Sequence, residues 1–148
     1  MEKIGSRIPD AEFIHGDSIS DNAGAEIVVG HDLYQVKKPD LCLVDARFKI
    51  GAGTAQEIVI AKQFNKPVVI VIPKDSHHRK SNVTFHGVQM EDWIHPFLKV
   101  STDYVADSVE DAAQWIEAYS KSPQLNKIKG LSVFEDAIDL FEHSSSLK

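Results

Sequence analysis

Two short apolar runs constrain the fold more than any other feature of this sequence. LCLVDA (41–46) and KPVVIVIP (66–73) are rich in aliphatic residues and lack strict alternation with polar residues. This pattern is typical of strands that are covered on both faces of a parallel sheet. The segment between them, GAGTAQEIVIAKQFN (51–65), has a helix start at Thr54 and a stop near Asn65. The sequence therefore predicts a strand–helix–strand unit, whose crossover should be right-handed.

Weaker patterns extend this alternation in both directions. Further strands are expected at AEFIH (11–15) and DYVAD (103–107), and further helices at 22–40, 108–120 and 133–143. Strands that alternate with helices indicate an α/β fold with three layers and a mostly parallel sheet, of the Rossmann or flavodoxin-like kind. The chain opens with MEKIGSRIP, which is more typical of the end of a helix. We therefore expect the usual first strand of such a sheet to be missing.

Size and composition exclude several classes of protein. A chain of 148 residues suits a single domain, 1–148, and its 43% hydrophobic and 26% charged residues are ordinary for a globular protein. The net charge of −6 argues against a nucleic-acid partner, because phosphate binding needs a basic face. The single cysteine, Cys42, is expected to be a small core residue. No apolar stretch has the length of a signal peptide or membrane span, so we expect a cytoplasmic protein with no membrane partner.

The C-terminal segment 133–143 is expected to be an amphipathic helix, followed by a frayed tail at 144–148. Its apolar face consists of Phe134, Ala137, Ile138 and Phe141. If this face packs against another copy of the chain, a homo-oligomer (a dimer or higher) follows.

Two acidic residues interrupt helical patterns. Asp32 shares a stripe with Val28, Val29 and Val36, and a buried carboxylate there would need a partner or a cavity. Taken alone, Asp32 is more often a solvated residue at a helix edge.

Glu57 has two interpretations. It follows Thr54 by three positions, the spacing of a capping box, and taken alone this structural role is the favoured one. It also shares a stripe with Ala61 and Phe64, in a first turn where the helix dipole keeps a carboxylate ionised. An ionised carboxylate in a partly dry pocket can attack an anomeric carbon, and a second carboxylate can supply the proton for the departing group.

Other polar residues favour ordinary roles. Asp45 follows a strand and could equally bind a ligand or cap the next turn. The histidines between 77 and 95 lack a known metal spacing, so a polar loop is favoured over a zinc site. A solvated loop is likewise favoured over a phosphate site for Ser76, Arg79, Lys80 and Ser81. His31 precedes Asp32, and neighbouring side chains on a helix point apart.

The run HDLYQVKKPDLCLVDARFKIGAGTAQEIVIAKQFNKPVVIVIP (31–73) resembles the nucleoside 2-deoxyribosyltransferase family, which includes deoxynucleoside 5′-monophosphate N-glycosidases. The similar features are Asp-Leu on a helix, an acidic residue before a hydrophobic strand, a Gly-rich loop, Glu, a helix of small residues, and Lys-Pro-Val. They occur in order and cover under a third of the chain closely. The chain departs from the family in lacking its usual first strand, and the loop 47–50 is about one residue longer than in the hydrolase branch.

The resemblance implies roles for individual residues. Glu57 corresponds to the family's nucleophile, and Asp32 to the acid that contacts the sugar and assists proton transfer. The positions implied to shape the sugar and base pocket are Asp45, Gly51, Gly53 and Thr54. The expected substrate is a small 2′-deoxynucleoside or its 5′-monophosphate, with the glycosyl-enzyme resolved by a second base or by water. Neither a metal nor an organic cofactor is expected. The alternatives are a non-catalytic nucleotide-binding module and an interaction subunit that uses the 133–143 helix.

Overall fold

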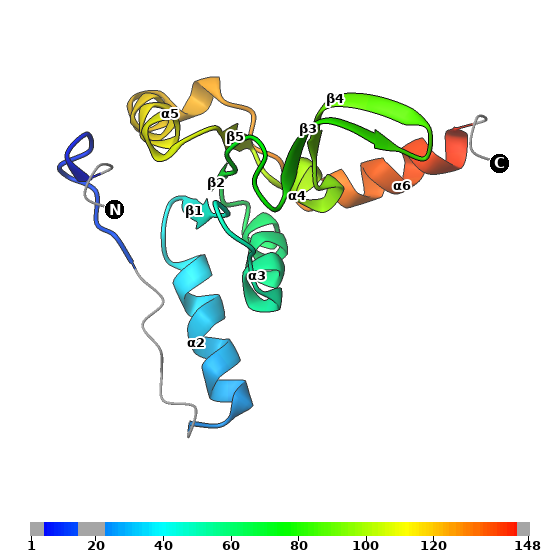
Figure 1. Ribbon diagram of the computed structural model, residues 1–148. Helices are drawn as coiled ribbons and strands as arrows, with labels where there is room; N and C mark the ends of the chain where they lie inside the picture. The colour runs from blue at the N-terminus through cyan, green and yellow to red at the C-terminus, as the bar shows by residue number, and fades with distance from the viewer. Residues whose placement is uncertain (1–4, 15–22, 145–148) are drawn as a thin grey trace.

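A parallel three-stranded sheet forms the centre of the structure, a computed structural model that describes residues 5–14 and 23–144 (Figure 1). The strands are β1 (Cys42–Asp45), β2 (Val68–Val71) and β5 (Tyr104–Ala106), in the order β1-β2-β5. Every residue of the central strand β2 is buried, which explains why its apolar run shows no alternation. The strands expected at 41–46, 66–73 and 103–107 are therefore confirmed, and each is shorter than the sequence predicted.

Helices cover both faces of this sheet, which confirms a mixed α/β fold. The helices are α2 (Ala25–Lys37), α3 (Ala52–Gln63), α4 (Pro96–Ser101), α5 (Val109–Lys121), the 3-10 turn η2 (Pro123–Leu125) and α6 (Val133–His143). Ile58 of α3 and Leu98 of α4 pack with Ile70 on one face. Ala112 of α5 packs with Val69 on the opposite face. The sheet thus lies between α2 and α3 on one side and α5 on the other (Figure 1).

An antiparallel hairpin, β3 (Arg79–Phe85) and β4 (Val88–Ile94), was not expected from the sequence. Its two-residue turn is His86-Gly87, and both residues have positive φ, at 48° and 81°, as a tight hairpin turn requires. The hairpin replaces the solvated loop expected around Arg79.

Arg79 is instead a buried anchor, with 6% of its surface exposed. Its guanidinium donates to both carboxylate oxygens of Asp92, at 2.7 Å each, and to the carbonyl of Ile72 at 3.1 Å. It also forms an ion pair with Asp107, just after β5. These contacts fix the hairpin to the carboxyl ends of β2 and β5.

The strand expected at 11–15 does not form in residues 11–14. His15 lies outside the described residues. Ala11 donates its backbone N–H to Ile8 (3.0 Å), which is a local turn rather than a sheet contact. Within residues 5–14 and 23–144, β1 therefore pairs only with β2.

The helix that carries Glu57 is fixed at its far end by a buried ion pair. Lys62 of α3 is fully buried, and its ammonium contacts the carboxylate of Asp103, which is also buried. The same ammonium donates to the carbonyl of Lys66 at 2.8 Å, and Asp103 accepts from the backbone N–H of Val68 at 2.7 Å. The network joins α3 to the start of β2 and to the segment before β5.

The C-terminal helix α6 forms where the sequence predicts it and extends away from the sheet (Figure 1). None of its side chains is buried, and Ile138 and Phe141 are each 58% exposed. The tail was expected at 144–148. Ser144 follows the helix and donates its backbone N–H to the carbonyl of Phe141, and residues 145–148 lie outside the described residues. No helix in the described part of the chain is long and apolar enough to cross a membrane.

Candidate functional site

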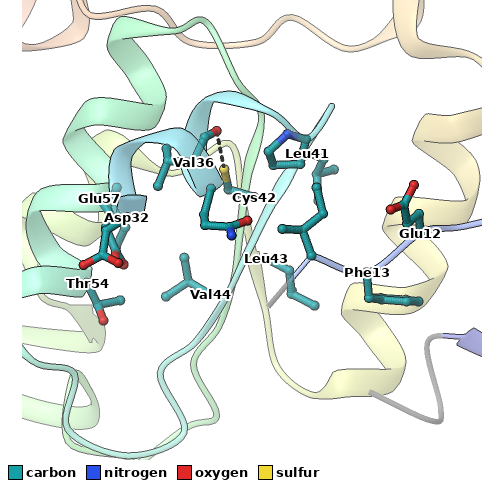
Figure 2. Close-up of a pocket in the computed structure, with 14 residues that line it drawn as sticks. Glu12, Phe13, Asp32, Val36, Leu41, Cys42, Leu43, Val44, Thr54 and Glu57 are labelled. Atoms are coloured by element: carbon teal, nitrogen blue, oxygen red, sulfur yellow. Dashed lines mark hydrogen bonds between the residues drawn. The ribbon is translucent and has the colours of Figure 1, made fainter. Parts of the chain in front are cut away.

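A cavity of about 280 Å³ lies where α2, α3 and β1 meet (Figure 2). Helix α2 contributes Asp32 and Gln35 to its lining, and α3 contributes Thr54 and Glu57. Strand β1 forms an apolar wall, and the segment 12–14 lies at the end opposite the carboxylates. This volume is near the lower end of the range of small-molecule sites, which is about 300–1,000 Å³.

The two carboxylates expected to act together do line the same cavity. Figure 2 shows Asp32 and Glu57 side by side, with Thr54 next to them. Burial raises the pKa of Glu57, and the nearby negative charge of Asp32 raises that pKa further. The two side chains therefore interact electrostatically across the α2–α3 contact.

The expected capping box is wrong. Helix α3 begins at Ala52, after Gly51 as N-cap, and no side chain caps it. Thr54 lies inside the first turn rather than before it, and Glu57 falls in the second turn. Glu57 is therefore not an acidic residue of the first turn, and the helix dipole supports its ionised form less than the sequence suggested. Its carboxylate has no hydrogen-bond partner among the described residues and is left to face the cavity.

A polar chain on α2 leads to Asp32. Nδ1 of His31 lies 3.3 Å from Oδ1 of Asp32, and Nε2 of His31 lies 3.2 Å from Nε2 of Gln35. The expectation that His31 and Asp32 point apart is therefore wrong, because the histidine ring turns back to its neighbour. The i, i+4 spacing of His31 and Gln35 indicates the contact between those two residues, but no spacing in the sequence indicates the contact between His31 and Asp32.

Gln35 also has an unsatisfied acceptor. Its Oε1 is buried at the cavity, and it has no hydrogen-bond partner among the described residues. Buried polar atoms are nearly always paired, with protein, water or ligand. Gln35 is thus suited to accept a hydrogen bond from an N–H or O–H of a bound molecule.

The apolar wall includes Cys42, Leu43 and Val44. Burial raises the pKa of the Cys42 thiol, and its sulfur lies 3.9 Å from the carbonyl oxygen of Val36. Cys42 packs against the core, as the sequence predicts. A thiol with a raised pKa is a poor nucleophile, so Cys42 is less suited to react in this cavity than a carboxylate is.

Three residues that the resemblance places in the pocket lie outside this cavity. Asp45 is exposed and paired with the guanidinium of Arg47 at 2.6 and 2.9 Å, and this contact lowers the pKa of Asp45. Gly51 lines a second cavity of about 390 Å³, on the α4 side of α3. Gly53 lines neither, and a Cβ at Gly51 or Gly53 would have no neighbour within 4 Å. The structure therefore brings together Asp32, Thr54 and Glu57 but not these three.

Two of the expected loop histidines line the second cavity. His78 accepts a hydrogen bond from the backbone N–H of Ile50 at 3.2 Å, and Nδ1 of His95 is buried with no partner in the described part of the chain. Within residues 5–14 and 23–144, no three or more histidine, cysteine, aspartate or glutamate side chains are grouped so that they could hold a metal ion.

The chain matches no family model, no curated protein and no solved structure. The cavity and its side chains are therefore the basis for a functional assignment.

Proposed function

We propose that this protein cleaves the N-glycosidic bond of 2′-deoxynucleosides or their 5′-monophosphates, as a nucleoside 2-deoxyribosyltransferase-like enzyme on a Rossmann-like fold. The observation that carries the proposal is that Asp32 and Glu57 come from neighbouring helices and line one cavity. Paired carboxylates on either side of a glycosidic bond are the usual means of its cleavage with retention. The resemblance of the segment 31–73 supplies the substrate class.

The reaction has two steps. A carboxylate oxygen of Glu57 attacks C1′, the C1′–N bond breaks, and its electron pair leaves with the base, which takes a proton from Asp32. The resulting glycosyl ester is then attacked at C1′ by a second base or by water. Asp32 takes the proton of that nucleophile, and Glu57 leaves as a carboxylate. Neither step requires a metal ion or an organic cofactor.

The environment of Glu57 is suited to this chemistry. A half-buried carboxylate with a raised pKa is more basic, and therefore more nucleophilic, than a fully solvated one, provided that the pH is high enough to ionise it. The same raised pKa also suits a proton donor. Whichever carboxylate attacks will carry the sugar after the first step. Identifying that residue therefore shows which carboxylate is the nucleophile.

The rest of the lining fits a small, partly apolar ligand. The aliphatic side chain of Val44, which lies on the α3 face of the sheet, can contact the flat face of a base or the C2′ methylene of a deoxyribose. Gln35 offers its unpaired Oε1 to a ligand donor. A pocket with an apolar wall and a few placed polar groups is the usual form of a small-molecule site.

Turnover can be measured directly. The protein is incubated with each deoxynucleoside and each 5′-monophosphate, with and without an acceptor base, and the products are separated by chromatography. A new nucleoside indicates transfer, and free base alone indicates hydrolysis. Glu57→Gln and Asp32→Asn should each lower the rate at least about 100-fold. The matched control, Glu91→Gln on the exposed face of β4, should leave it unchanged, and full turnover by Glu57→Gln would contradict the assignment.

A non-catalytic nucleotide-binding module is the second candidate. It is favoured by the outer edge of β1, where no further strand closes the cavity within the described residues. Nucleotide binding at the cavity without any turnover would support this candidate over the enzyme.

We also propose that the protein is a homo-oligomer, a dimer or higher, that associates through α6. A helix of 11 residues with no buried side chain is marginal in water unless its apolar face is covered. An interaction subunit that uses this helix would be the remaining alternative if no nucleotide binds.

A further inference from the structure

Three polar side chains of α2 form a connected chain that ends at the cavity. Gln35 contacts His31, one helical turn away, and His31 contacts Asp32, at 3.2 and 3.3 Å. The ring of His31 is the better buried of the pair, because its side chain is 20% exposed and that of Asp32 is 46% exposed. The surrounding structure therefore holds the ring more firmly than it holds the carboxylate.

The orientation of the Gln35 amide, with its nitrogen towards the ring of His31, assigns the ring proton. The amide nitrogen of Gln35 can only donate hydrogen bonds, so Nε2 of His31 is the acceptor. The ring proton of a neutral His31 then lies on Nδ1, the nitrogen that faces Oδ1 of Asp32. Nδ1 donates to Oδ1 of Asp32, which accepts this bond whether or not Oδ2 carries a proton.

The bond between His31 and Asp32 does not cap an end of α2. Both residues lie in the middle of the helix, where backbone groups are paired within it. The bond does distinguish the two carboxylate oxygens of Asp32. Oδ1 is occupied by His31, and Oδ2 has no hydrogen-bond partner among the described residues.

We infer that His31 is a positioning residue for the proposed cleavage of the glycosidic bond. As the Nδ1–H tautomer, fixed by Gln35, it holds Oδ1 of Asp32 and leaves Oδ2 to exchange a proton with the departing base. This inference rests on the proposed function of the cavity. The long Nδ1–Oδ1 distance of 3.3 Å is expected to shorten in the substrate complex, as catalytic hydrogen bonds often do.

The tautomer can be measured without any turnover. In protein labelled with ¹⁵N at histidine, the nitrogen shifts of neutral His31 should report protonation at Nδ1. In Gln35→Met the fixing contact is lost, and His31 should shift towards the Nε2–H tautomer. An Nε2–H tautomer in the wild type, or an identical tautomer in both proteins, would overturn the inference, whatever the protein catalyses.

The kinetics of His31 variants then test whether the ring positions Asp32. Asn in place of His31 can present an N–H near the position of Nδ1, whereas Gln presents one near Nε2 and Phe presents none. We expect kcat to fall about 10- to 100-fold in His31→Phe and His31→Gln, with KM within about threefold, because a misplaced proton donor slows chemistry more than binding. His31→Asn should recover most of the rate.

The possible outcomes are distinguishable. If the wild type turns over substrate and His31→Phe is as fast, the positioning role is wrong while the proposed function stands. If no substrate is turned over, the proposed function fails and the role of His31 fails with it, even where the tautomer is Nδ1–H. Equal loss in His31→Asn and His31→Phe, with unchanged folding, would also contradict the role of the Nδ1 donor.

Discussion

The carboxylate of Glu57 on α3 lies beside that of Asp32 on α2, and the charge of Asp32 adds to the effect of burial in raising the pKa of Glu57. Two like charges in a partly buried cavity reduce stability when both are ionised. Such an arrangement is common where a protein favours chemistry over stability.

Glu57→Gln should stabilise the protein at neutral pH. The pKa of Glu57 is raised above its unfolded value of 4.5, so the folded state binds this proton more readily than the unfolded chain does. The stability that the group contributes is present below pH 4.5 and is lost as the pH rises through the raised pKa. Thermal unfolding should therefore show a higher Tm for Glu57→Gln than for the wild type at pH 7. The gain should disappear towards pH 4.

The control for this prediction is Glu91→Gln, an exposed residue of β4. It should show no gain that depends on pH. A loss of Tm in Glu57→Gln at pH 7 would mean that the ionised carboxylate of Glu57 stabilises the folded state and would contradict this prediction.

Arg79 should be a major contributor to stability through the hairpin. Arg79→Ala removes the donor that joins Asp92, Ile72 and Asp107, and we expect the free energy of unfolding to fall by about 2–4 kcal/mol. Arg79→Lys should recover only part of this, because an ammonium cannot bind Asp92 with two parallel bonds. Chemical denaturation measures both. Equal stability of Arg79→Lys and the wild type would show that the forked geometry is unimportant.

Lys62 should be equally critical at the other end of α3. Lys62→Met leaves the buried carboxylate of Asp103 without its cation, at a cost of about 3–5 kcal/mol. The matched control is Lys121→Met, which breaks an exposed i, i+4 pair with Glu117 and should leave the denaturation midpoint almost unchanged. A small effect of Lys62→Met would mean that Asp103 is satisfied by backbone donors alone.

The exposed face of α6 predicts a change of assembly. Ile138→Asp and Phe141→Asp place charges on the face that we propose packs against another copy. Light scattering after size-exclusion chromatography should show a smaller species for these variants than for the wild type. Glu135→Gln, on the polar side of the same helix, is the control. A wild-type monomer would contradict the proposed homo-oligomer.

Local patterns in the sequence predict much of the fold. The run around Ile70 is buried on both faces, and the run around Val44 packs partly buried side chains against helices on both faces, so short apolar runs between turn residues correctly predict both strands. The helix expected at 108–120 is confirmed as α5, and the side chain of Ser108 caps it by accepting from the backbone N–H of Asp111. These features depend on residues that are close in the chain.

The features that the sequence did not predict depend on distant partners or on side-chain geometry. Arg79 and Lys62 look like surface residues until Asp92, Asp107 and Asp103 are brought to them by the fold. The start of α3 was misplaced because its N-cap is Gly51, which caps with no side chain. The His31 contact was missed because spacing on a helix does not determine how a ring turns.

The candidate site was foreseen in part. The expectation that Asp32 and Glu57 share a cavity is confirmed, because α2 and α3 contact each other. The stripe used for Asp32 is only partly inward, since Val29 is exposed and the Asp32 side chain is 46% exposed. The loop positions Asp45, Gly51 and Gly53 could not be placed from spacing. Their distance from the cavity depends on the path of the loop after β1.

The central claim is that Glu57 becomes covalently attached to the sugar. Protein that has been mixed briefly with a deoxynucleoside and quenched in acid is digested, and its peptides are analysed by mass spectrometry. We predict a deoxyribosyl adduct on the peptide that contains Glu57, and its absence in Glu57→Gln. An adduct on Asp32 would reverse the two roles, and turnover of the same substrate with no adduct on either residue would contradict the covalent mechanism.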